Sequence, residues 1–282
     1  MTEDHTDVLA RLDAMAVQEA TLRRRDYLRR NAHSTVTEAD RAALVSWVQQ
    51  IQTSLNLGPD AAWLAFSYFD RYLASGRGRS RDVLRNKGQF QLAAVTAFYT
   101  AVKITAPVVL GLDMLAAICH GRYDESDFAA MERDMLSALG WRVAVHTPMD
   151  VVRHLVEALQ VESKIAEGLL QACQEYASRS ISDLGLSCCP PSVMGIACLA
   201  TVLAEGDLRS SAKRALWDGL QAISPVDPSS RQVFEARERL MSLDAPRKAS
   251  VPSKVAPSRS SHAAVSDGPH SPVCVSQTAR QA

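Results

Sequence analysis

The sequence has little of what marks a nucleic-acid-binding or membrane protein. Its 282 residues carry no net charge, because 31 Lys and Arg residues balance 31 Asp and Glu residues. A neutral chain has no global basic field that would attract a phosphate backbone or an anionic membrane surface. The longest apolar runs, residues 92–102 and 193–204, fall short of the roughly 20 residues that a membrane span needs. We therefore expect no membrane segment, and nucleic acid is disfavoured as the main partner.

The sequence also lacks the residue groupings that enzymes and metal sites need. Cys173, Cys188, Cys189 and Cys198 show neither paired C-x-x-C spacing nor partner histidines, so a metal site is not expected. Gly76-Arg77-Gly78 is more typical of a turn between helices than of a nucleotide-binding loop. The first residues are acidic and polar, unlike a secretory signal, which favours an intracellular, reduced protein. We expect no catalytic residue, no metal and no cofactor.

Most of the sequence shows apolar residues at helical spacing. Aromatic residues make up only 6% of the chain, and Ala, Leu, Arg, Glu and Gln recur with the helical period, which predicts an all-α fold. The first expected series of helices is 40–55, 60–74, 90–103, 112–119 and about 128–139. Thr147, as an N-cap, and Pro148, as the first helical residue, open a second series. Its expected helices are 149–159, 163–180, 190–204, 210–223 and 229–243.

These two series predict tandem five-helix domains, residues 37–146 and 147–243. Residues 1–36 are polar with an arginine-rich patch, and we expect one peripheral helix there. Residues 244–282 are rich in Ser and Pro and show no apolar period. Such a segment cannot bury enough surface to offset the entropy of ordering, so we expect a disordered tail.

Five charged residues lie within or beside apolar helix faces, where a lone charge is costly. Asp70 follows an aromatic run and needs a partner such as Arg41 or Arg71, which predicts an internal salt bridge between the first two helices. Lys103 ends the most apolar helix, and Glu132 lies one step off the apolar stripe of the fifth helix. These two residues either point out of the same rim or are ordinary solvated helix residues.

Five sequence motifs carry a family resemblance. They are RAALVSW (41–47), YFDRYL (68–73), FQLAAVTAFYTAVK (90–103), MERDMLSALGWRVAVHTP (131–148) and CPPSVMGIACLATVL (189–203). Their order and separations resemble those of the cyclins, specifically a cyclin with both cyclin boxes whose second half is somewhat similar to D-type members. The resemblance covers about residues 27–243, and it implies two tandem cyclin-box domains.

The resemblance implies a regulatory function. Cyclins bind and activate cyclin-dependent protein kinases by docking on the kinase helix C, in cell-cycle control, and perform no chemistry themselves. The residues that match the kinase-binding positions of the family are Lys103, Glu132, Ile104, Leu136 and Trp141. Arg41 and Asp70 match the family's internal salt bridge. Location in the nucleus and cytoplasm also follows from the resemblance.

Two departures from the family pattern affect partner choice. Lys103 is followed by Ile104-Thr105-Ala106, where the family usually has acidic support. The patch that docks kinase substrates or inhibitors retains Leu44, Trp47 and Gln91 but lacks two of its usual apolar residues. The alternative functions are a cyclin-fold module for transcription or nucleic-acid binding, and a scaffold that binds no kinase.

Overall fold

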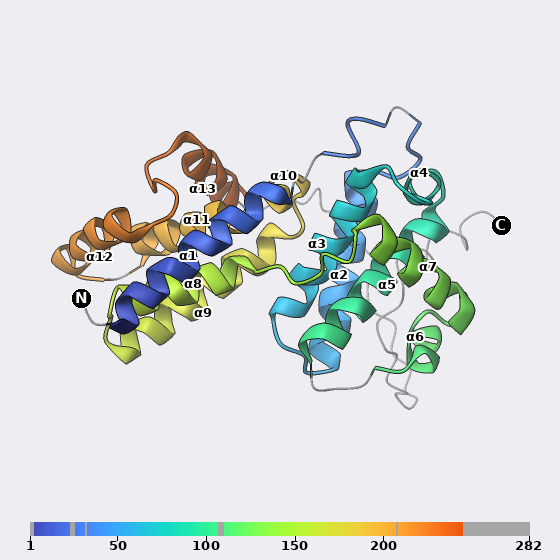
Figure 1. Ribbon diagram of the computed structural model, residues 1–282, viewed down its shortest axis with the longest axis horizontal. Helices are drawn as coiled ribbons and strands as arrows, with labels where there is room; N and C mark the ends of the chain where they lie inside the picture. The colour runs from blue at the N-terminus through green and yellow to red at the C-terminus, as the bar shows by residue number, and fades with distance from the viewer. Residues whose placement is uncertain (1–2, 23–25, 32, 107–109, 207, 245–282) are drawn as a thin grey trace, which may run out of the picture.

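The computed structural model describes residues 3–22, 26–31, 33–106, 110–206 and 208–244 (Figure 1). Within these ranges the chain contains helices and no strand, so the predicted all-α fold is confirmed. The helices form two groups that lie side by side along the long axis of the molecule (Figure 1). Each group has its own cluster of buried hydrophobic side chains. The predicted disordered tail lies outside the described residues, except for Asp244, which ends the last helix.

Six helices make up the first group. They are α2 (Glu38–Ser54), α3 (Asp60–Ser75), α4 (Ser80–Val83), α5 (Lys87–Thr105), α6 (Leu112–Ile118) and α7 (Glu125–Ala138). The five longer ones correspond to the five predicted helices. Gly76 ends α3 with a backbone φ of 64°, the left-handed cap that glycine favours. The short helix α4 lies in a stretch expected to be a loop, because a single turn leaves no apolar period in the sequence.

The second group repeats this plan. Its helices are α8 (Pro148–Ala158), α9 (Ser163–Ser180), α10 (Leu184–Ser187), α11 (Pro191–Glu205), α12 (Ser210–Ile223) and α13 (Arg231–Asp244). Thr147 caps α8 through reciprocal hydrogen bonds with Asp150, and Pro148 follows as its first residue, as predicted. The one-turn helix α10 was not predicted, for the same reason as α4.

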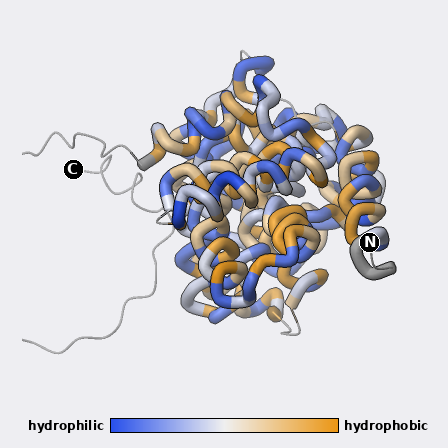
Figure 2. The backbone as a smooth tube through the Cα atoms, turned by 90° about the vertical axis from the view of Figure 1, so that its left-hand side faces the viewer, coloured by the Kyte–Doolittle hydropathy of each residue, from blue (hydrophilic) through white to orange (hydrophobic). Residues whose placement is uncertain are grey.

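The centre of each group is a helix that is apolar on all sides. In the first group this is α5, which packs against α3 and α7; in the second it is α11, which packs against α8, α9 and α13. Such a helix must be surrounded by others to remove its surface from water. Most other helices alternate in colour along the tube in Figure 2, the pattern of one buried and one exposed face. At Gly195 of α11 an added Cβ would lie 2.7 Å from the Pro148 carbonyl oxygen, so this close crossing requires glycine.

The N-terminal helix α1 (Glu3–Thr21) lies against the second group (Figure 1). It packs on α8 and α11, with Leu12 buried in the second core. It is the one helix in the described part of residues 1–36, and it precedes the arginine-rich patch, of which Arg23–Arg25 lie outside the described residues. Tyr27, which lies within that patch, is buried in the first core. The N-terminal segment therefore contacts both domains.

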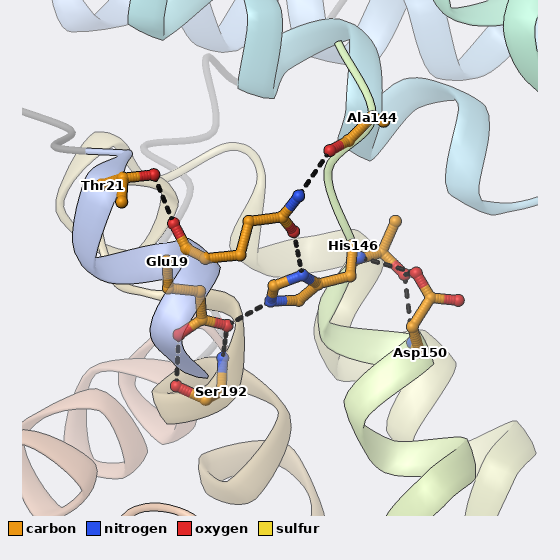
Figure 3. A network of polar contacts seen from close by, with 8 residues as sticks. Glu19, Thr21, Ala144, His146, Asp150 and Ser192 are labelled. Carbon is orange, nitrogen blue, oxygen red and sulfur yellow. Dashed lines mark hydrogen bonds and ion pairs between the residues drawn. The ribbon is translucent and has the colours of Figure 1, made fainter. Parts of the chain in front are cut away.

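Polar contacts fasten the end of α1 to the connection between the domains (Figure 3). The Glu19 carboxylate accepts hydrogen bonds from the Ser192 backbone N–H, at 2.7 Å, and from the Ser192 hydroxyl. It also lies 2.5 Å from His146 Nε2, while Gln18 Oε1 lies 2.9 Å from His146 Nδ1. Gln18 in turn donates to the Ala144 carbonyl oxygen at 2.8 Å. One carboxylate thus holds both the connection before α8 and the first turn of α11, where a negative charge complements the helix dipole.

A buried ion pair joins the two domains. Arg41 Nε lies 2.9 Å from Asp70 Oδ1 and Arg41 Nη2 lies 2.7 Å from Asp70 Oδ2, so the expected salt bridge between α2 and α3 is present. Arg41 also donates to the Ile181 carbonyl oxygen at 2.6 Å and to the Ser187 hydroxyl at 3.0 Å. Both acceptors lie between α9 and α11, in the second half of the sequence. The sequence predicts only the contact between the first two helices, whereas the pair also binds groups in the second half of the chain.

Asp70 has partners of its own beside Arg41. The Ser187 hydroxyl donates to Asp70 Oδ2 at 2.6 Å, and the Tyr27 hydroxyl donates to Asp70 Oδ1 at 3.0 Å. Burial, with the Asp70 charge nearby, raises the pKa of the Tyr27 hydroxyl well above its ordinary value, so the group stays a donor. Burial has the largest single effect on the pKa of Arg41 and lowers it, but the charge and hydrogen bond of Asp70, together with Tyr27 and Cys188, outweigh burial and raise the net pKa. Both side chains of the pair are thus fully hydrogen-bonded, the condition under which a buried pair is tolerated.

Among the described residues, no helix combines the length and the apolar character that crossing a bilayer requires.

Removing Asp70 should destabilise the protein strongly. Asp70→Ala leaves the Arg41 guanidinium buried without a counter-charge, which costs about 3–5 kcal/mol. Lys87→Ala is the matched control, because it removes an ion pair with Asp40 in which the lysine is half exposed and should cost about 0–1 kcal/mol. Chemical denaturation measures both free energies of unfolding. Equal losses in the two variants would contradict the role given to the buried pair.

Removing Glu19 should loosen α1. Glu19→Ala leaves the buried Ser192 N–H and one nitrogen of His146 without their acceptor, and we expect a loss of about 1.5–3 kcal/mol. Hydrogen exchange should then speed up in α1 before it does in α11. Glu167→Ala, at an exposed position on α9, is the control and should change neither quantity. Unchanged exchange in α1 would show that the contacts of Figure 3 do not hold it in place.

Candidate functional site

Lys103 and Glu132 form an ion pair where the end of α5 meets α7. Lys103 Nζ lies 3.0 Å from Glu132 Oε1 and 3.1 Å from Oε2. The Thr100 hydroxyl, one turn earlier on α5, donates to Glu132 Oε1 at 3.0 Å. The ammonium group also lies 4.8 Å from the centre of the Tyr99 ring, within range of a cation–π contact. The sequence left open whether these two residues share a rim, and the structure brings them together.

This pair lies at the surface. The Lys103 side chain is 46% exposed and the Glu132 side chain is 16% exposed. Pairs of this kind contribute only about 0–1 kcal/mol to stability, so stability alone gives little reason for it. Lys103 has three N–H donors, and Glu132 has two acceptor oxygens. Together they can hydrogen-bond the backbone carbonyl and N–H groups of a partner.

Exposed apolar side chains flank the ion pair. Ile104, next to Lys103, is 48% exposed, and Leu136, one turn after Glu132 on α7, is partly buried. Trp141, which follows the end of α7, is 67% exposed. We call Lys103, Ile104, Glu132, Leu136 and Trp141 the α5–α7 rim. Large exposed apolar groups beside hydrogen-bonding charges are typical of a protein interaction surface.

The backbone at Trp141 holds its side chain outward. Gly140 and Trp141 have φ values of 61° and 60°, so both are left-handed. For a bulky residue this conformation is an outlier, and outliers of this kind concentrate where function requires them. The Trp141 N–H donates to the Leu136 carbonyl oxygen at 2.9 Å, which closes the end of α7. The ion pair in the middle of α7 and this cap at its end therefore both fix the position of rim residues.

The residues after Lys103 supply no acidic support. Ile104 is exposed, and the Thr105 hydroxyl donates to the Ala101 carbonyl oxygen at 2.8 Å within its own helix. Glu132 is thus the carboxylate that contacts Lys103 in the described part of the chain. A partner that requires further negative charge beside Lys103 will not find it in residues 104–106.

Leu44, Trp47 and Gln91 do not form the accessible docking patch that the sequence predicts, because all three are buried. Their exposed fractions are 3%, 2% and 1%. Leu44 and Trp47 are three residues apart on the inward stripe of α2, so both face the first core. The Gln91 side chain accepts a hydrogen bond from the Tyr123 hydroxyl at 3.2 Å. These side chains build the core and are not available to substrates or inhibitors in this structure.

Sequence reasoning missed three partners of the Arg41–Asp70 pair, namely Tyr27, Ile181 and Ser187. The one signal for Tyr27 was an aromatic residue in an otherwise polar segment. Ile181 contributes only its backbone carbonyl, and Ser187 is 117 positions away from Asp70, so no local pattern could have connected them.

Comparison with known proteins also finds similarity to cyclins. The family model "Cyclin, N-terminal domain" matches residues 11–144. The putative cyclin-F2-1 of Oryza sativa subsp. japonica is 28% identical over 196 residues, which cover 69% of this chain and 49% of the relative. The G2/mitotic-specific cyclin-2 of Antirrhinum majus is 26% identical over 175 residues, covering 61% and 36%. The chain thus spans less than half the length of these relatives, and its likeness to D-type members stays a prediction.

A solved structure shares the fold. A viral cyclin from herpesvirus saimiri aligns with a TM-score of 0.65 over 82% of this chain and 97% of that chain, at 17% identity. At this identity the likeness concerns the fold alone, and it supports the tandem arrangement of helices. The family model, the relatives and the shared fold thus show that the chain is similar to cyclins.

Proposed function

We propose that this chain is a regulatory subunit that binds and activates a cyclin-dependent protein kinase in cell-cycle control, and that it performs no chemistry itself. The observation that carries the proposal is the α5–α7 rim, where a half-exposed ion pair lies beside Ile104 and Trp141. The rim consists of the five residues that the family resemblance assigns to kinase binding. Surface position, hydrogen-bonding capacity and exposed apolar area all suit a protein partner.

The proposed mechanism is a shift between two kinase conformations. Lys103 and Glu132 would bind the kinase backbone beside its helix C, while the apolar side chains pack against that helix. Inward rotation of the helix completes the kinase Lys–Glu ion pair that orients ATP. The cyclin activates because it binds the active conformation more tightly than the inactive one. Its own ion pair is weak enough to re-pair with the kinase at little cost.

The two alternatives have less support. A nucleic-acid-binding module needs a basic surface, and this chain is neutral overall. A scaffold that binds no kinase would tolerate the loss of Lys103 and Glu132, which the double variant below tests.

The double variant Lys103→Ala, Glu132→Ala should abolish association with a cyclin-dependent kinase while changing the free energy of unfolding by only about 0–1 kcal/mol. The measurement is phosphorylation of a Ser-Pro peptide by purified catalytic subunits, each mixed with the full chain. Lys164→Ala with Glu167→Ala removes one charge of each sign from the exposed side of α9 and is the matched control. Full activation by the rim variant, or none by the unaltered chain with any catalytic subunit, would refute the proposal.

Trp141→Ala should weaken the kinase complex and leave the fold intact. An exposed tryptophan that becomes buried on binding typically contributes about 2 kcal/mol, close to a 30-fold rise in Kd. Met241→Ala, at an exposed apolar position on α13, serves as the control. Titration calorimetry of each variant against the activated kinase measures both constants. Equal affinities for the two variants would place the kinase elsewhere on the chain.

A further inference from the structure

Arg71 is a buried cation whose charge is not balanced. It follows Asp70 on α3 and is 7% exposed. Its Nη2 donates to the Arg142 carbonyl oxygen at 2.8 Å, while its Nη1 has no hydrogen-bond partner. Asp70, the neighbouring carboxylate, is engaged by Arg41. A buried donor without an acceptor costs free energy, so such a group in a native protein requires an explanation.

Arg71 opens onto a cavity that carries further positive charge. The cavity has a volume of about 730 Å³ and lies between the ends of α1 and α3 and the turn that follows α7. Arg77 and Arg142, both exposed, share its wall with Arg71. Among the described residues, no Asp or Glu lines it. Asp134 nearby accepts hydrogen bonds from the Tyr72 hydroxyl, at 2.5 Å, and from the Arg79 backbone N–H, at 3.0 Å.

The guanidinium groups of Arg71 and Arg142 repel one another when the cavity is empty, and Arg77 adds a third positive charge to its wall. Burial lowers the pKa of Arg71, and the charge of Arg142 lowers it further. An anion in the cavity would remove this repulsion and supply acceptor oxygens to the arginines that line it. Guanidinium groups bind carboxylate or phosphate oxygens through paired N–H donors.

We propose that this arginine cavity binds the phosphate group of a phosphoserine or phosphothreonine in a partner protein. A phosphate monoester carries close to two negative charges and three acceptor oxygens, which match three arginines, whereas one carboxylate would leave two of them unpaired. The cavity is also larger than a phosphate ion needs. Ala20, Ala74 and Ala138 line the remainder, and these small side chains leave room for the peptide on either side of the phosphorylated residue.

This assignment does not depend on kinase binding. Arg142 follows Trp141 in the sequence, so the cavity borders the α5–α7 rim, but the two surfaces use different residues. A phosphopeptide that binds here would add a second point of attachment for a phosphorylated protein, and linked contacts increase overall affinity.

The test is a direct binding measurement on the full chain. A fluorescent peptide of Gly and Ala with a central phosphoserine is titrated by anisotropy, beside the same peptide with Ser or Asp at the centre. We expect the phosphopeptide to bind at least about tenfold more tightly than the other two. Arg142→Ala and Arg77→Ala should each weaken it several-fold, and Arg71→Lys, which keeps the charge but loses the paired donors, should weaken it as well.

Arg214→Ala is the matched control, because Arg214 is an exposed arginine on α12, away from the cavity. It should bind the phosphopeptide as the unaltered chain does. Thermal unfolding separates loss of binding from loss of fold, and the exposed positions Arg77 and Arg142 keep the test valid if Arg71→Lys fails to fold. Equal binding of the phospho and Ser peptides, equal effects of Arg142→Ala and Arg214→Ala, or inorganic phosphate binding as tightly as the phosphopeptide would each overturn the proposal.

Discussion

The buried pair of Arg41 and Asp70 is the interaction on which the rest of the structure depends. It connects α2 with α3 in the first domain and reaches a carbonyl oxygen and a hydroxyl between α9 and α11 in the second. Tyr27 adds the segment after α1. Losing a partner of a buried charge is costly. These elements must therefore keep the relative position in which every hydrogen bond of the pair is made. A pair that tolerates no rearrangement thereby fixes how the two helical groups meet.

A second cation–carboxylate pair in the same domain has the opposite character. Lys103 and Glu132 are partly exposed, contribute little to stability and lie beside exposed apolar side chains. The chemistry of the two pairs is nearly the same, and burial decides their roles. The enclosed pair determines the fold, while the exposed pair is free to exchange partners when another protein arrives. Arg71 presents a third case, a buried guanidinium whose counter-charge the described chain does not supply.

Helix positions could be predicted from the sequence because their apolar period is local. The ten longer helices after α1 follow from that period, whereas the one-turn helices α4 and α10 leave no trace in it. The docking patch was mispredicted because the spacing of Leu44 and Trp47 shows which face they share but not whether that face is covered. Glu19 and Ser192 are 173 positions apart, and their contact arises only once α1 lies on α11. The rim residues were found by family resemblance, and the ion pair between two of them then appeared in the geometry.

The central claim is the proposal that the α5–α7 rim binds a cyclin-dependent protein kinase. Hydrogen exchange of the full chain, with and without the catalytic subunit that it activates, tests this claim most directly. We predict slower exchange at the end of α5 and from Glu132 to Arg142 when the kinase is present, with α12 and α13 unchanged. Protection confined to α9, α12 or α13, with the rim exchanging as before, would contradict the account.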